Sequence, residues 1–253
     1  MRLLDRIYKM ASNPGLLEYI QSRNIDVEFL IEAGCHDGTD TLKFVSDRRF
    51  KKIYAFEPDS EAFELARLRL ANFLDIVTLK SVVLMDQARE VIAHPLDGNF
   101  GTGSTIFNSF LESSDQDTSR VMFAMPMDEV IPRDLSGKGA LWLDVEGAGL
   151  LVLRGSRRIL RQIAIAQIEV EMHNQSTKRL KNYLGIVRLM KDNDFYLVGA
   201  PLHPGYFGDV LFLSKGEVGF FIRLKSYCLQ VLFITLHAFI YPMLRKPRNF
   251  LDS

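Results

Sequence analysis

The sequence predicts an α/β fold built on a doubly wound, mostly parallel seven-stranded sheet. Short apolar segments alternate along the chain with helical patterns, which is the sequence form of repeated βαβ units. The apolar segments are continuous, as expected for strands that helices cover on both faces. The 253 residues suit one such domain with some appended material. Hydrophobic residues make up 47% of the chain, enough to bury a core and to exclude wholesale disorder.

The elements follow from these patterns in chain order. Strands are predicted at 27–33, 52–56, 77–84, 140–144, 163–170, 195–198 and 209–213. Helices are predicted at 39–46, 60–72, 148–160 and 177–192. In the second helix Ser60 is a candidate cap, and Leu65 and Leu68 belong to an apolar stripe expected to face the sheet. Residues 96–120 are rich in Gly, Ser, Thr, Asn and Asp and predict a long surface loop, with a short hairpin around 90–94 and 105–107.

A glycine turn follows the first predicted strand, where residues 32–39 have the sequence EAGCHDGT. Gly34 and Gly38 let the backbone approach a ligand closely, and the helix that begins at Thr39 offers free N–H groups. The spacing from Glu32 is E-x-G-x-x-x-G. It lacks the compact G-x-G-x-x-G that places a pyrophosphate at a helix N-terminus, which argues against a dinucleotide.

The second predicted strand ends at Glu57, 19 residues after Gly38. A carboxylate at this place can accept hydrogen bonds from both hydroxyls of a ribose. Either feature alone also fits a structural turn or a solvated surface acid. Together, in this order, they predict a ligand that contains a nucleoside.

The strand at 140–144 delivers two carboxylates, Asp144 and Glu146, to its carboxyl end. Ligands of open α/β sheets bind outside that end, near the switch in strand order, so both side chains are expected in the crevice that holds Gly34. Glu146 fits equally well as a cap of the next helix.

These three segments, EAGCHDG, YAFEPD and LDVEGAGLLVLRG, resemble the FkbM family of S-adenosylmethionine-dependent methyltransferases over about residues 28 to 213. The resemblance implies the class I, Rossmann-like methyltransferase fold and an O-methyltransferase that acts on sugars, glycans or related metabolites. By this resemblance the segment around Glu32, Gly34 and Gly38 would bind the methionine and adenosine parts of the cofactor, Glu57 its ribose, and residues 83–86 its adenine. The full set of cofactor-binding residues it implies is Glu32, Ala33, Gly34, Cys35, Asp37, Gly38, Glu57, Pro58, Val83 and Asp86.

The chain departs from the family pattern at two positions. Trp142 stands where the family often has lysine, and Gly149 where it often has glutamate. The departures leave the cofactor assignment intact and concern the acceptor side of the site.

Methyl transfer to a hydroxyl benefits from a general base. The candidates are Asp144, Glu146, Glu171 and His173, all near predicted strand ends, with Asp144 ranked first and Glu171 or His173 second. Asp144, Glu171 and His173 also form a set that can ligate a divalent metal, but no spacing signature supports one, and no metal is predicted.

Two other classes of function remain as alternatives. One is a nucleotide-binding oxidoreductase, because an acid after the second strand also suits NAD; the missing glycine and the absence of a Tyr-x-x-x-Lys pair argue against it. The other is a non-catalytic domain of the same fold that binds a partner or a membrane through its tail. The zero net charge does not favour a nucleic-acid partner. The two cysteines, Cys35 and Cys228, indicate a reducing compartment rather than a disulfide framework, so a cytoplasmic location is predicted.

Two parts of the chain are predicted: a methyltransferase domain at 1–215 and a carboxyl-terminal hydrophobic helical segment at 216–253. No charged residue occurs from Ser226 to Leu244, and basic residues flank the stretch on both sides. This pattern suits a helix at a membrane interface, here the inner face, which would bring the enzyme to a lipid-linked acceptor. Burial against the domain or in a homodimer is the alternative interpretation.

Overall fold

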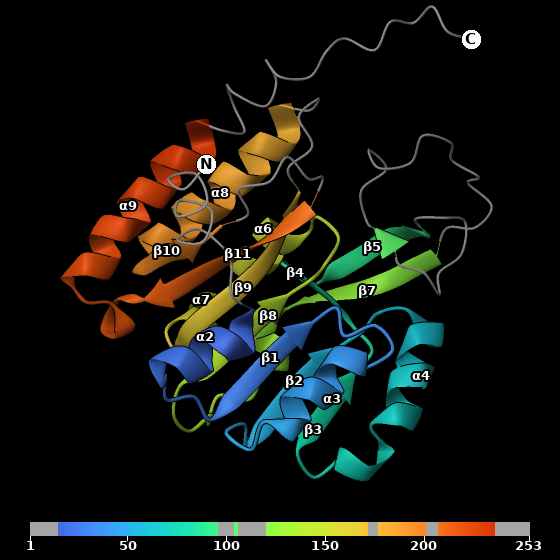
Figure 1. Ribbon diagram of the computed structural model, residues 1–253. Helices are drawn as coiled ribbons and strands as arrows, with labels where there is room; N and C mark the ends of the chain where they lie inside the picture. The colour runs from blue at the N-terminus through green and yellow to red at the C-terminus, as the bar shows by residue number, and fades with distance from the viewer. Residues whose placement is uncertain (1–14, 96–103, 106–119, 172–176, 201–206, 236–253) are drawn as a thin grey trace, which may run out of the picture.

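The computed structural model describes residues 15–95, 104–105, 120–171, 177–200 and 207–235, and is built around a seven-stranded sheet (Figure 1). The strand order is β10-β11-β9-β8-β1-β2-β3, and β11 is antiparallel to both of its neighbours while the other pairs are parallel. This confirms the predicted fold class. The strands are β1 (Phe29–Ala33), β2 (Lys52–Phe56), β3 (Val77–Lys80), β8 (Gly139–Leu143), β9 (Ile163–Glu171), β10 (Phe195–Gly199) and β11 (Phe207–Ser214).

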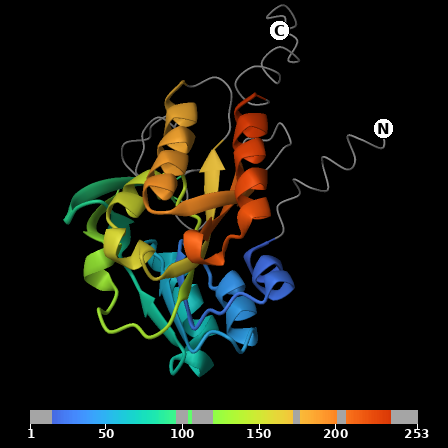
Figure 2. The same cartoon turned by 90° about the vertical axis from the view of Figure 1, so that its left-hand side faces the viewer.

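Helices cover both faces of this sheet (Figures 1 and 2). Apolar side chains of α2 (Leu16–Arg23), α3 (Thr39–Ser46) and α4 (Ser60–Arg69) join the core on one face. Those of α5 (Met127–Val130), α6 (Gly149–Arg154), α7 (Arg157–Leu160) and α8 (Thr177–Asp192) join the core on the other face. The continuous apolar strands of the sequence therefore lie between two apolar layers.

A second sheet stands beside the first and contains β4 (Val83–Met85), β5 (Arg89–Pro95), β6 (Ser104–Thr105) and β7 (Arg120–Pro126), in the order β4-β7-β5-β6. The predicted hairpin is present, because His94 pairs with Thr105. The prediction of one strand at 77–84 is wrong: the chain leaves the main sheet after Lys80, and β4 pairs with β7 instead. Strand β7 was not predicted, because only its partners in the second sheet make it a strand.

The helix predicted at 148–160 is also divided, into α6 and α7, at Gly155 and Ser156. A Cβ on Gly155 would lie 2.1 Å from the carbonyl oxygen of Met85, so the chain passes too close to β4 for any side chain at this position. In α4 the cap is Asp59, not Ser60: its Oδ1 accepts the N–H groups of Glu61 and Ala62 at 3.0 and 2.9 Å. The predicted stripe is wrong at Leu65 and Leu68, which are exposed.

After the last strand, a 3-10 turn (Lys215–Glu217) leads into α9 (Phe220–Thr235), which packs along the edge strand β10 (Figure 2). Leu229 of α9 is buried in the core, so the helix is attached to the domain. Within the described ranges, no helix has both the length and the apolar character needed to cross a bilayer.

Candidate functional site

A cavity of about 360 Å³ opens at the carboxyl ends of β1, β2 and β8. It lies where the strand order reverses, since β1 has β2 on one side and β8 on the other. This is the place at which open α/β sheets bind ligands. The lining residues are Ala33, Gly34, His36, Phe56, Glu57, Pro58, Asp59, Val82, Val83, Leu84, Ala93, Met122, Asp144, Val145, Glu146 and Ala148.

The floor of the cavity is the glycine turn after β1. Gly34 has a φ of +83°, and a Cβ there would lie 1.7 Å from the carbonyl oxygen of Asp144. The N–H groups of Gly34 and Cys35 both donate to the carbonyl of Phe56, at 2.9 and 3.0 Å, and the N–H of Asp144 donates to Ala33 at 2.9 Å. These bonds hold the ends of three strands together, and the close approach requires glycine.

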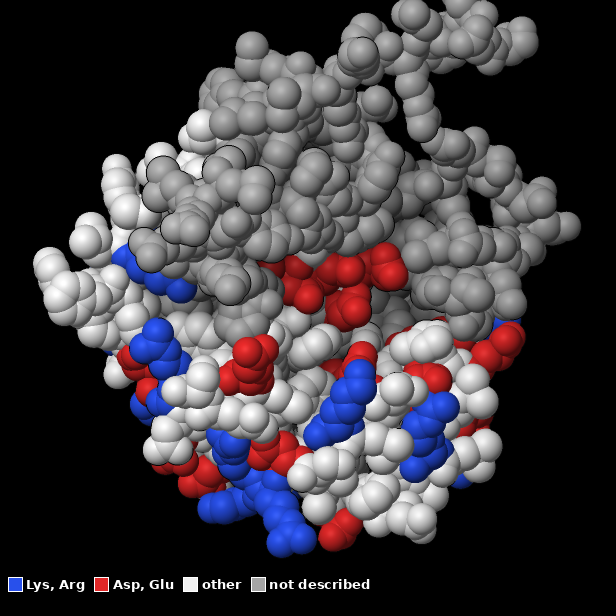
Figure 3. Space-filling model, viewed as in Figure 1, with Lys and Arg blue, Asp and Glu red and all other residues white. Residues whose placement is uncertain are grey.

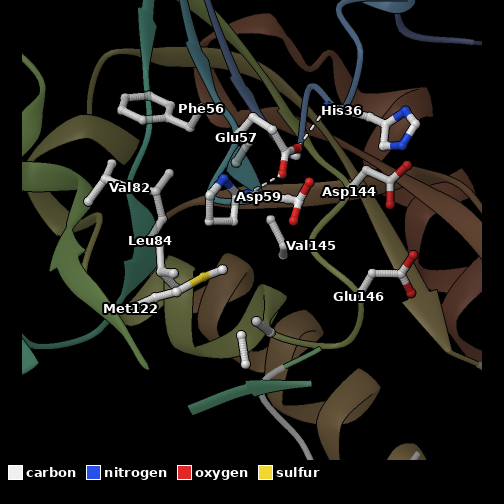
Figure 4. A pocket seen from close by; sticks show the side chains of 16 residues that line it. His36, Phe56, Glu57, Asp59, Val82, Leu84, Met122, Asp144, Val145 and Glu146 are labelled. Carbon is white, nitrogen blue, oxygen red and sulfur yellow. Dashed lines mark hydrogen bonds between the residues drawn. The ribbon is translucent and has the colours of Figure 1, made fainter. Parts of the chain in front are cut away.

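Glu57 is held rigidly at one side of the cavity. Its Oε2 accepts the N–H of His36 and its Oε1 accepts the N–H of Asp59, each at 2.8 Å (Figure 4). The side chain is 7% exposed. Burial raises the pKa of Glu57, while the two N–H donors oppose the shift by favouring the carboxylate. Each oxygen keeps further acceptor capacity for a ligand in the cavity.

An apolar wall stands opposite the carboxylates. Figure 4 shows Phe56, Val82, Leu84 and Met122 together on one side, with Asp144 and Glu146 on the other. Met122 belongs to β7, so the second sheet completes this wall. Met122 and Ala93 were not predicted, because nothing in the local sequence indicates that their strands, β7 and β5, border the site.

Acidic side chains gather in the hollow at the centre of the face shown in Figure 3. Three acids lie on neighbouring strands of the sheet: Asp144 follows β8, Glu169 is in β9 and Asp209 is in β11. The backbone of Glu169 pairs directly with that of Asp209. Asp144 is solvent-accessible in the cavity, and Glu169 hydrogen-bonds to it. Burial, followed by the charges of Asp144 and Glu146, raises the pKa of Glu169 to about 9.

Burial and the neighbouring carboxylates thus favour the protonated form of Glu169 beside Asp144. Burial raises the pKa of Asp144 as well, but the hydrogen bond from Glu169 favours its carboxylate. Glu169 was not among the residues predicted from the sequence. Side chains alternate between the two faces of a strand, so Glu169 lies on the same face of β9 as Gln167, and this alternation could have indicated it.

This pair gives a pH prediction. A glutamate in the unfolded chain titrates near about 4.3. Because the pKa of Glu169 is raised to about 9 in the folded state, the folded protein binds more protons between these values, and the free energy of unfolding falls as pH rises. We expect Glu169→Gln to gain stability relative to wild type by at most about 1.4 kcal/mol per pH unit across this window. Urea unfolding at pH 5, 7 and 9 measures it.

The control is Glu64→Gln, an exposed acid on α4 that pairs with Arg67. It should follow the wild-type pH profile. Parallel profiles for Glu169→Gln and wild type would contradict the raised pKa of Glu169.

Several residues expected at the cofactor lie near the cavity without lining it. Glu32 is fully buried in β1 beside Trp142, and burial raises its pKa to about 8. Cys35 is buried behind the turn. Asp37 is paired with Arg69, whose guanidinium lowers the pKa of Asp37 to about 2. Gly38, with φ +77°, is the N-cap of α3.

The remaining expected residues fall elsewhere. Asp86 pairs with Arg89 at 3.0 Å, away from the cavity. The backbone of Glu171 pairs with Phe207 at the end of β9, and His173 lies outside the described residues. Across the described ranges, no group of His, Cys, Asp and Glu has an arrangement that would hold a metal ion.

Two comparisons identify relatives of this chain. A family model described as "Methyltransferase FkbM domain" matches residues 32–197. A curated relative, "2-O-methyltransferase NoeI" of Sinorhizobium fredii (strain NBRC 101917 / NGR234), is 25% identical over 142 residues, covering 52% of this chain and 58% of the relative. The chain thus spans little more than half of that protein's length.

A solved structure has the same fold. The crystal structure of methyltransferase FkbM from Methylobacillus flagellatus KT superposes with a TM-score of 0.54 at 17% identity, covering 82% of this chain and 50% of that one.

Proposed function

The chain belongs to the FkbM methyltransferase family, and from this premise we propose that it transfers the methyl group of S-adenosylmethionine to a hydroxyl of a sugar, glycan or related metabolite. S-adenosylmethionine is the cofactor of this family. The observation that carries the proposal is the cavity at the switch point, where Glu57 is fixed by two backbone N–H groups and Asp144 stands accessible on the other side.

The residues of the cavity fit this cofactor. The lining contains the carboxylates of Glu57, Asp59, Asp144 and Glu146, and no Lys or Arg occurs among the described residues that form it. Such a site favours a cationic sulfonium and ammonium, and it repels the two negative charges of a dinucleotide pyrophosphate. The oxidoreductase alternative is therefore disfavoured.

The proposed roles follow from position. Glu57 accepts hydrogen bonds from the ribose hydroxyls. The wall of Phe56, Val82, Leu84 and Met122 packs against the adenine, and the turn at Ala33 and Gly34 lies against the methionine part. Pro58 and Val83 complete the wall, whereas Glu32, Cys35, Asp37 and Gly38 shape the turn from behind.

Asp144 is the proposed general base. When bound, the cofactor supplies an electrophilic methyl group. Asp144 accepts the proton of the acceptor hydroxyl, and Glu169 orients its carboxylate through their hydrogen bond. Glu146, at φ +45°, lines the cavity beside it and is placed to bind the acceptor. The relative's description as a 2-O-methyltransferase supports an oxygen acceptor on a sugar.

The test of the activity is methyl transfer from isotopically labelled S-adenosylmethionine to a panel of glycosides, with the methyl ether located by mass spectrometry. Titration calorimetry with S-adenosylmethionine and with NAD is the binding control. Binding of NAD but not S-adenosylmethionine would overturn the proposal.

Glu57→Gln should weaken S-adenosylmethionine binding by about 10- to 100-fold. An amide cannot accept from both backbone N–H groups and from the ribose, and a hydrogen bond to a charged group is worth about 1.5–3 kcal/mol. Titration calorimetry measures the dissociation constant, and Glu64→Gln, on the exposed face of α4, is the matched control. Equal affinity of Glu57→Gln and wild type would remove Glu57 from the ribose site.

A further inference from the structure

Helix α9 exposes a continuous apolar face to solvent. The exposed fractions are 76% at Phe220, 82% at Phe221, 56% at Leu224, 68% at Tyr227 and 49% at Val231. Positions 220, 224, 227 and 231 are spaced by four, three and four residues, so their side chains lie on one side of the helix. Phe221 borders this side, with its ring centre 5.8 Å from that of Phe220. We call these five residues the α9 stripe.

The opposite side of α9 already has its partner. Ser226 and Leu229 are buried, and the helix packs along β10. The α9 stripe is therefore not the face that attaches the helix to the domain. Contiguous exposed apolar surface on a helix marks an interaction site rather than a solvated face.

Basic side chains border the α9 stripe on both flanks. Arg223 is exposed, with its guanidinium 5.5 Å from the ring centre of Tyr196, and Lys225 is half-buried on the other flank. Arg23 of α2 is close enough to Lys225 to help burial lower the pKa of its ammonium. Helix α9 contains no acid, and Glu217, just before it, is paired with Lys138 at 2.6 Å.

The sequence after the helix is also poor in acids and rich in basic residues. From Val218 to Leu251 the chain contains no Asp or Glu, and Arg245, Lys246 and Arg248 add three further positive charges. A protein with zero net charge thus concentrates positive charge and apolar side chains in one segment. An anionic surface with an apolar interior complements both.

We propose that the α9 stripe, with Arg23, Arg223 and Lys225, is a docking face for an anionic lipid bilayer. The helix would lie in the interface with Phe220, Phe221 and Leu224 among the acyl chains and with the cations at the headgroups. Tyr227 has the amphipathic ring that favours this depth. The proposal concerns a surface, and it holds or fails independently of methyl transfer.

The test is sedimentation of the full chain with vesicles of phosphatidylcholine alone or mixed with phosphatidylglycerol. We expect binding to the anionic vesicles that weakens as salt is raised. The double variant Phe221→Asp, Leu224→Asp should lower the partition coefficient roughly tenfold or more. The matched control is Leu65→Asp, Leu68→Asp on α4, where the leucines are 54% and 65% exposed; it should bind as wild type does.

Circular dichroism and urea unfolding establish that both double variants fold, and Arg223→Gln with Lys225→Gln tests the charge by itself. The proposal is overturned if the wild-type protein does not bind anionic vesicles, or if the α9 and α4 double variants lose vesicle binding equally. It is also overturned if the α9 double variant changes only the oligomeric state, from dimer to monomer. A second copy of the chain would then be what covers the α9 stripe.

Discussion

Gly34→Ala is expected to abolish S-adenosylmethionine binding and to destabilise the protein by about 2–5 kcal/mol. The added Cβ would lie 1.7 Å from the backbone oxygen of Asp144, which cannot move without separating β1 from β8. Overpacking of this kind costs about 1–3 kcal/mol, and the φ of +83° adds about 1–2 kcal/mol for any residue with a side chain. Urea unfolding and titration calorimetry measure the two effects.

The matched control is Gly149→Ala. A Cβ at Gly149 would meet its nearest neighbour, the Cγ2 of Ile168, at 3.5 Å, which is ordinary contact, and its φ is not positive. This variant should keep wild-type stability and affinity. If Gly34→Ala behaved like Gly149→Ala, the close approach of β1 and β8 would be wrong.

Asp144→Asn should lower kcat by about 10²- to 10⁴-fold, the usual contribution of general-base catalysis. The amide keeps the shape of the side chain and cannot take the acceptor's proton. Because the pKa of Asp144 is raised and a base must be unprotonated, wild-type kcat should rise with pH through that pKa and then level off. Steady-state kinetics across the pH range tests both statements.

Two measurements make this result specific. The dissociation constant for S-adenosylmethionine should change far less than kcat, which separates loss of the base from loss of the cofactor site. Asp192→Asn, an exposed acid on α8, should leave kcat unchanged. Unchanged turnover in Asp144→Asn with bound cofactor would assign the base elsewhere.

Much of the site was predictable because it depends on short segments of chain. The glycine turn, Glu57 and Asp144 each stand at the end of an apolar strand, and parallel strands bring their carboxyl ends to one edge. Glu32 shows the limit of such reasoning. It lies next to the turn in sequence, but strand alternation directs it away from the cavity, against Trp142 and α3.

The sequence by itself determined the fold class, the switch-point crevice and the family, because these follow from local periodicity and from residues at strand ends. Only the tertiary structure decided the second sheet, the break at Gly155, the wall formed by Met122 and the placement of Glu169 beside Asp144. Each of these depends on contact between segments far apart in the chain. No local pattern encodes such a partner: Arg120–Pro126 becomes a strand because β4 and β5 are there to pair with it.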